Sequence, residues 1–297
     1  MFTRLKILAL PLLLAAILGV LSFAGCGGKP GGDGNGGGDL TQAELEQVMA
    51  DSMVAYQDAT TYGFTYDLDM HMEAVGGSSP GSVDMIMRGD GHADIDASTM
   101  LMNMEVSLES DLEGMEGSQV MSAEIYMLTD WMYMKIEVTG LGEQWVKTPV
   151  TEDVKDAYNL NIVDQQLTPL ESMAEIKFVK YQSVDGSECY VLEVIPDINA
   201  MKDYLDSQEL TAGQDWDMLI EDMFNELSYT VWIDTETNAM KKMSMVIDMD
   251  LTPGQVGADE SDFDTMTMHM ELQMTLGDYN EPVNIDLPDE ALDAEEM

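Results

Sequence analysis

The sequence has 297 residues, of which 45% are hydrophobic, and its 57 Asp and Glu residues against 12 Lys and Arg give a formal net charge of −45. Nucleic-acid phosphates and anionic lipid headgroups repel such a chain, which excludes nucleic-acid binding and electrostatic adhesion to an anionic membrane. Two cysteines exclude a disulfide framework, and the hydrophobic content suffices for the core of one large domain.

The N-terminal residues have the three parts of a secretory signal. Two basic residues, Arg4 and Lys6, are followed by an apolar run to Val20, and small residues then precede Cys26. This run is shorter than the about 20 residues that span a membrane, so it predicts a lipoprotein signal peptide, 1–25, rather than a permanent helix. An ordinary signal peptide with an incidental cysteine is the alternative.

A lipidated Cys26 would hold the protein at the cell membrane, because two acyl chains anchor firmly where one binds only marginally. Residues 26–39 contain many glycines with scattered Pro, Asp and Asn, and they predict a flexible tether. We therefore expect a monomeric, lipid-anchored protein that faces the extracellular or periplasmic side.

A single domain, residues 40–290, is predicted to open with a helix. Thr41 and Glu44 form a capping box, and apolar spacing continues to about Thr60. Residues 64–74 then alternate strictly between apolar and polar, which predicts a strand with one dry and one wet face. Further strands are expected at 83–95, 100–108, 121–128, 131–138 and 144–147.

The second half mixes helical and strand patterns. Residues 152–170, 198–205 and 216–227 have helical spacing. Strands are expected at 176–182 and 188–195 around a turn at Asp185 and Gly186, and again at 229–234, 240–251 and 265–276. Residues 278–287 close the domain and 291–297 form an acidic tail.

This order predicts an α+β fold with a strongly curved antiparallel sheet. Strands that follow one another through short turns pair in antiparallel fashion. Because the sheet is long and dry on one face, it should curl, and helices should cover the dry face.

Methionine is unusually frequent, with 28 residues that concentrate at dry positions of the predicted strands. Three interpretations remain open: an ordinary core built from methionine, a cavity for a hydrophobic ligand, and a Cu(I) site. Thioether side chains adapt to varied apolar partners, and soft sulfur binds Cu(I). Copper is disfavoured, since His71 and His269 must point away from the methionines beside them in a strand.

Other motifs do not support an enzyme or a cofactor. Residues 77–81 match G-x-S-x-G by letters but lie in a turn between strands, and the EF-hand spacing across 33–44 lacks a preceding helix. A row from Asp90 to Asp96 fits a solvated strand face better than a cation site. Cys189 lies within an apolar strand pattern and is expected to be a buried thiol.

Five segments, taken in order, carry a family resemblance: 131–135, 145–147, 186–194, 229–234 and the closing segment 278–288. In this order the chain resembles the LolA-like superfamily of bacterial lipoproteins, nearest to the LppX/LprG group. The resemblance covers residues 40–290. It implies an incomplete, strongly curved antiparallel barrel with helices in its mouth, and a hydrophobic cavity that holds a lipid or lipoprotein cargo.

We therefore expect a non-enzymatic protein that binds a hydrophobic or acyl-chain ligand by burial against the dry face, with the helix 216–227 as a lid. The alternative is a structural or sensory surface module that binds another protein. The residues expected to line the ligand site are Met70, Met72, Met102, Met104, Met134, Met245, Met268, Met270, Trp216 and Phe224.

Overall fold

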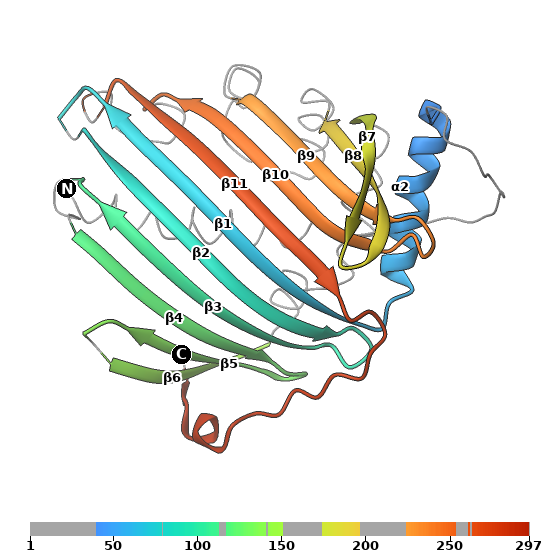
Figure 1. The fold of residues 1–297 in the computed structure, drawn as a ribbon. Coiled ribbons are helices and arrows are strands. Elements are labelled where there is room, and N and C mark those ends of the chain that lie inside the picture. Colours follow the sequence, from blue (N-terminus) through green and yellow to red (C-terminus); the bar gives the residue numbers. More distant parts are fainter. Residues whose placement is uncertain are drawn as a thin grey trace.

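The computed structural model describes residues 40–78, 80–112, 117–140, 142–150, 174–196, 224–253, 261 and 263–296. These residues form one twelve-stranded sheet in the order β12-β6-β5-β4-β3-β2-β1-β11-β10-β9-β8-β7 (Figure 1). Every neighbouring pair is antiparallel except β12 with β6, which is parallel. The curved antiparallel sheet expected from the sequence is confirmed.

The helix α2, Gln42–Gln57, precedes the sheet. Its N-cap is Thr41, whose side-chain oxygen accepts from the Glu44 amide while the Glu44 carboxylate accepts from the Thr41 amide at 2.7 Å. This reciprocal pair satisfies two of the donors that a helix start leaves unpaired. The predicted capping box is thus present, and the helix begins where the sequence placed it.

The first half of the chain is a meander on one side of the sheet. Its six strands are β1 (Thr61–Val75), β2 (Gly81–Asp94), β3 (Thr99–Ser110), β4 (Gly117–Met127), β5 (Trp131–Val138) and β6 (Gly142–Pro149). Each pairs with the next through a short connection, as the alternation predicted.

The second half returns from the opposite edge. Its strands are β7 (Ala174–Val184), β8 (Ser187–Pro196), β9 (Phe224–Asp234), β10 (Met240–Leu251) and β11 (Thr265–Gly277). The last of them, β11, pairs with β1 along thirteen residue pairs, so the longest strands lie side by side at the centre. The two halves of the chain therefore share one continuous surface.

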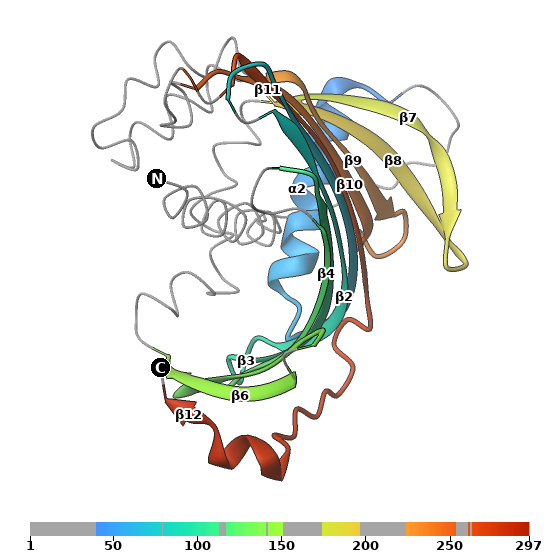
Figure 2. The same ribbon diagram turned by 90° about the vertical axis from the view of Figure 1, so that its left-hand side faces the viewer.

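The sheet curves strongly, and α2 lies on its concave side (Figure 2). This helix packs through Leu45, Met53 and Tyr56 into the same apolar cluster as the sheet residues. The expected helices at 152–170 and 198–205 lie outside the described residues. Helical cover over the rest of the concave face therefore remains a prediction, and the described part of the chain is mostly β.

Two expectations about element ends are wrong. The helix predicted for 216–227 does not include its last four residues, because β9 begins at Phe224. Phe224 pairs with Met249 and Leu227 with Ile247, so the sheet uses their apolar side chains. The tail predicted from residue 291 is also part of the fold: Asp289–Asp293 is a 3-10 helix, and β12 (Glu295–Glu296) pairs with β6.

Candidate functional site

Strand β1 shows how the sequence separates the two faces of the sheet. Phe64, Tyr66, Leu68 and Met70 are all buried, while the residues between them, such as Asp69, face outward. Successive side chains of a strand point to opposite faces, so the strict alternation puts every apolar residue on one side. Because directly paired residues lie on the same face, the neighbouring strands β2 and β11 have the same apolar and polar faces.

Methionines meet one another across the strands of the concave face. Met70 is the direct partner of Met85 on β2 and of Met270 on β11. Met72 is the partner of Met268, which in turn opposes Met249 on β10. Directly opposed side chains share a face and lie close enough to touch. The result is a continuous thioether-rich surface rather than isolated core positions.

All eight methionines expected to line the ligand site lie at concave-face positions. Met70, Met102, Met245 and Met270 are buried, whereas Met72, Met104, Met134 and Met268 are half-buried. Phe224 is half-buried at the start of β9 on the same face, opposite Met249. Trp216 lies outside the described residues. Whether these side chains contact a ligand stays a prediction.

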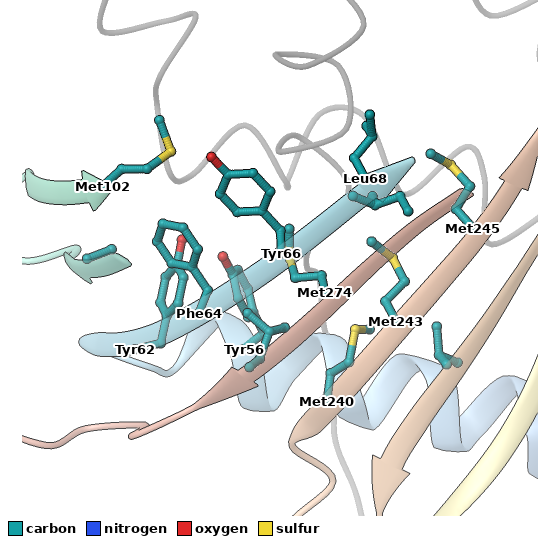
Figure 3. Packing of buried hydrophobic residues seen from close by; sticks show 14 of the residues in the cluster. Tyr56, Tyr62, Phe64, Tyr66, Leu68, Met102, Met240, Met243, Met245 and Met274 are labelled. Carbon is teal, nitrogen blue, oxygen red and sulfur yellow. The ribbon is translucent and has the colours of Figure 1, made fainter. Parts of the chain in front are cut away.

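An aromatic ladder connects α2 to the middle of the sheet. The ring of Tyr56 lies 5.3 Å from that of Tyr62, Tyr62 lies 6.1 Å from Phe64, and Phe64 lies 6.5 Å from Tyr66 (centroid distances). Figure 3 shows these rings beside Met102, Met243 and Met274 in one cluster. Ring pairs at such separations add attraction beyond their buried area. The ladder fixes the helix against the concave face.

One hydroxyl of this ladder has no hydrogen bond in the described part of the chain: that of Tyr66, whose residue is 8% exposed. An unmade hydrogen bond on a buried polar group costs about 1–3 kcal/mol. Burial raises the pKa of Tyr66 well above its ordinary value, so the side chain is a neutral donor. In the sequence alone, Tyr66 is only one of several apolar positions in an alternating strand. Two glycines across the strand, Gly89 and Gly91, are the signal that could have singled it out.

The convex face carries the histidines, away from the methionines. Nδ1 of His71 lies 2.7 Å from Oδ1 of Asp84, and Nδ1 of His269 lies 2.6 Å from Oδ1 of Asp248. Asp248 raises the pKa of His269. The imidazoles of His71 and His269 thus point away from the neighbouring methionines, as the strand alternation predicted. Among the described residues, no three His, Cys, Asp or Glu side chains gather to hold a metal ion.

Cys189 is fully buried in β8, as the sequence predicted, and burial raises the pKa of its thiol. A thiol is a poor nucleophile, since the thiolate is the reactive form. The G-x-S-x-G match lies in the connection between β1 and β2, which are antiparallel neighbours, and not at a strand-to-helix turn. Within the described ranges, no helix is long and apolar enough to cross a membrane.

Comparison with protein families decides where the chain belongs. Residues 44–296 match DUF6612, a family of unknown function. The chain belongs to the DUF6612 family. The match spans the sheet from α2 to β12, so it includes the C-terminal residues that complete the β6 edge in this DUF6612 protein. No curated protein matches the DUF6612 chain.

Solved structures match the DUF6612 chain over most of its length. Lipoprotein LppX from Mycobacterium tuberculosis is 14% identical, with 83% of this chain and 100% of that chain covered and a TM-score of 0.39. LprF from Mycobacterium bovis is 17% identical, with 84% and 99% covered and a TM-score of 0.44. A LolA-superfamily protein from Nitrosomonas europaea is 10% identical, with 84% and 96% covered and a TM-score of 0.19.

These matches confirm the resemblance to LolA-like and LppX-like proteins that the order of segments indicated. All three TM-scores are below 0.5. We therefore base the function of the DUF6612 protein on its own residues and their geometry.

Proposed function

We propose that this protein is a non-enzymatic binding protein that holds a hydrophobic, acyl-chain ligand against the concave face of its sheet. One observation carries the proposal: the methionines of the central strands stand opposite one another on that face, in rows such as Met85, Met70 and Met270. Flexible thioether side chains can repack around chains of different shape. Polar and charged partners lie on the other face, where His71 and His269 bind their aspartates.

Burial supplies the binding energy in this proposal. Each buried methylene contributes about 0.8 kcal/mol, so ten methylenes contribute about 8 kcal/mol before the cost of ordering. Only the part of this sum that exceeds the cost of association and ordering appears as binding free energy, so micromolar affinity, about 8 kcal/mol net, needs a longer buried chain. The half-buried residues Met72, Met104, Met134 and Met268 have surface left for the ligand to cover.

Native mass spectrometry of the full-length protein, purified from a lipid-containing host, tests the proposal. Masses are compared before and after denaturation, which separates a bound lipid from one attached covalently. We expect a mass that leaves on denaturation and a smaller amount of it in Met104→Asp. The matched control is Ser107→Asp on the convex side of the same strand β3, which should keep the ligand.

The same experiment distinguishes lipid binding from the alternative function, recognition of another protein. A full-length protein that carries no lipid and takes up neither added phospholipid nor fatty acid would contradict the binding function. That outcome would favour a surface module that recognises another protein.

We propose further that the protein is exported and held at the cell membrane through lipidated Cys26. The supporting features are the basic start, the short apolar run and the small residues before Cys26, followed by a glycine-rich tether. Radiolabelled palmitate should label the wild-type protein and not Cys26→Ser. Equal labelling of both proteins would contradict a lipid on this residue. Cys189→Ser is the control, because its thiol is buried in β8.

A further inference from the structure

The ring of Tyr66 lies in a cradle, by which we mean the space left on β2 because Gly89 and Gly91 have no side chains. Its direct partner on β2 is Gly89, and Gly91 is the partner of Phe64. A Cβ atom at Gly89 would lie 2.5 Å from both Cζ and Oη of Tyr66, and one at Gly91 would collide with Cζ of Phe64. Both rings therefore occupy the space that β2 side chains would fill. Packing fixes the position of the Tyr66 hydroxyl, to which no described residue makes a hydrogen bond.

Phe64 packs in the same way although it has no hydroxyl, so the packing of the Tyr66 ring does not depend on its hydroxyl. It occupies the same kind of glycine-vacated site two residues earlier on β1, with similar burial. Other buried tyrosine hydroxyls near the ladder are bonded: Tyr62 shares a hydrogen bond with Tyr56, and Tyr279 donates to the Met240 carbonyl at 2.6 Å. Only the oxygen of Tyr66 in this ladder is left without a partner among the described residues. A buried polar group in that condition needs an explanation, and a bound ligand that accepts its hydrogen bond is one.

The position of this hydroxyl points to the ligand face. Figure 3 shows the ring of Tyr66 leaning toward the side of Met102, and its oxygen lies over Gly89 of β2, on the concave side of the sheet. Tyr66 lies in the row that contains Met104 on β3 and Met274 on β11, both on the concave surface. A ligand held against the methionines would thus meet one fixed donor.

The charges around the concave face select the kind of acceptor. The register of strand pairing puts the basic residues of the described strands on the convex face. There, Arg88 binds Asp67, Lys135 binds Glu124, and Lys242 stacks on Trp232. Lys241 lies in the bulge of β10. A carboxylate or phosphate beside Tyr66 would therefore lack a counter-charge from these strands and add to a formal charge of −45. An uncharged oxygen acceptor needs no counter-charge and adds nothing to the net charge.

We infer that Tyr66 is a specificity-determining residue that donates a hydrogen bond to an uncharged carbonyl oxygen, of an ester or amide, within the bound hydrophobic ligand. This rests on the proposed function. The methionines supply the area for the chain, and Tyr66 sets its register along the face.

The test uses the full-length protein, the variant Tyr66→Phe and two probes of similar length, methyl palmitate and octadecane. Wild type should favour the ester over the alkane about fivefold more than Tyr66→Phe does, because one hydrogen bond to a neutral carbonyl is gained. Comparing the two proteins cancels the difference in probe solubility. The ester carbonyl stretch should lie at lower wavenumber on wild type than on Tyr66→Phe.

Tyr62→Phe is the matched control, since Tyr62 already has Tyr56 as its partner. Tyr62→Phe should destabilise the ligand-free protein and leave the ester preference unchanged, whereas Tyr66→Phe should not destabilise the ligand-free protein.

Palmitate is the third probe, and its binding should gain nothing from the Tyr66 hydroxyl. A gain equal to that of the ester would overturn the choice of an uncharged acceptor. Equal ester preference in wild type and Tyr66→Phe would overturn the role of Tyr66 and leave the proposed function intact. Proteins that bind none of the probes would overturn both.

Discussion

Nδ1 of His269 lies 2.6 Å from Oδ1 of Asp248, its direct partner across the β10–β11 pair on the convex face. The hydrogen bond to Asp248 raises the pKa of His269. Because the folded-state pKa is the higher one, the pair stabilises the fold fully below about pH 6.5 and this stabilisation is lost as pH rises through the raised pKa.

Replacing Asp248 with Asn should therefore weaken the fold more at pH 5.5 than at pH 8. Both side chains are more than a third exposed, so solvent screening limits the difference to about 0.5 kcal/mol. Urea unfolding at the two pH values measures it, with Ser244→Ala on the same strand as the control. A difference that persists unchanged in 1 M salt would contradict a screened surface pair.

Asp234 stabilises the turn between β9 and β10. Burial by itself disfavours its carboxylate, but the amides of Thr237 and Glu236 donate to Oδ1 at 3.0 and 2.9 Å, and they hold the pKa of Asp234 below its usual value. Asp234→Ala should cost about 2 kcal/mol at pH 7. Since the folded-state pKa is depressed, this stabilisation is present above about pH 4 and is lost as pH falls through the folded value.

Urea unfolding of Asp234→Ala and wild type at pH 7 and at pH 3 checks this sign. Glu236→Ala, an exposed change in the same turn, is the control and should leave the free energy of unfolding within about 0.5 kcal/mol. A cost that is equal at both pH values would show that the charge of Asp234 is irrelevant.

How far the sequence predicts this fold depends on how local each signal is. The wet and dry faces of β1 follow from alternation alone, because period 2 is a property of any strand. Phe224 and Leu227 were placed in a helix, since apolar residues from Trp216 onward have helical spacing. Pairing with β10 decided otherwise, and such pairing is not local. The role of Tyr66 was missed for the same reason: its cradle is Gly89, twenty-three positions away and adjacent only through register.

Gly91 tests the cradle directly. Its Cβ would collide with the ring of Phe64 and with the carbonyl of Leu101, and a backbone atom cannot move aside cheaply. Gly91→Ala should lower the free energy of unfolding by about 1–3 kcal/mol. Gly277→Ala, on β11, is the matched control because nothing lies within 4 Å of its Cβ position. Equal effects of the two substitutions in thermal or urea unfolding would contradict the steric account.

Two methionines of the concave face should behave differently. Met87 is 1% exposed, so Met87→Ala leaves a cavity and should cost about 2–5 kcal/mol. Met72 is half-buried at the end of β1, and Met72→Ala should cost about 1 kcal/mol while it lowers the amount of bound ligand. Urea unfolding and native mass spectrometry measure the two effects separately. A large loss of stability in Met72→Ala would mean that this residue belongs to the core and not to the ligand surface.

The short strand β12 covers the outer edge of β6. Glu295 and Glu296 pair with Val146 and Lys147, while Ala291 is fully buried in the 3-10 helix that leads to them. An uncovered edge offers its backbone groups to another chain. Deleting residues 289–297 should therefore speed amide hydrogen exchange in β6 and cause concentration-dependent association in sedimentation experiments. The double variant Glu295→Ala and Glu296→Ala keeps the backbone pairs and should associate no more than the wild type does. If it associates as strongly as the deletion, loss of acidic charge and not the exposed edge is the cause.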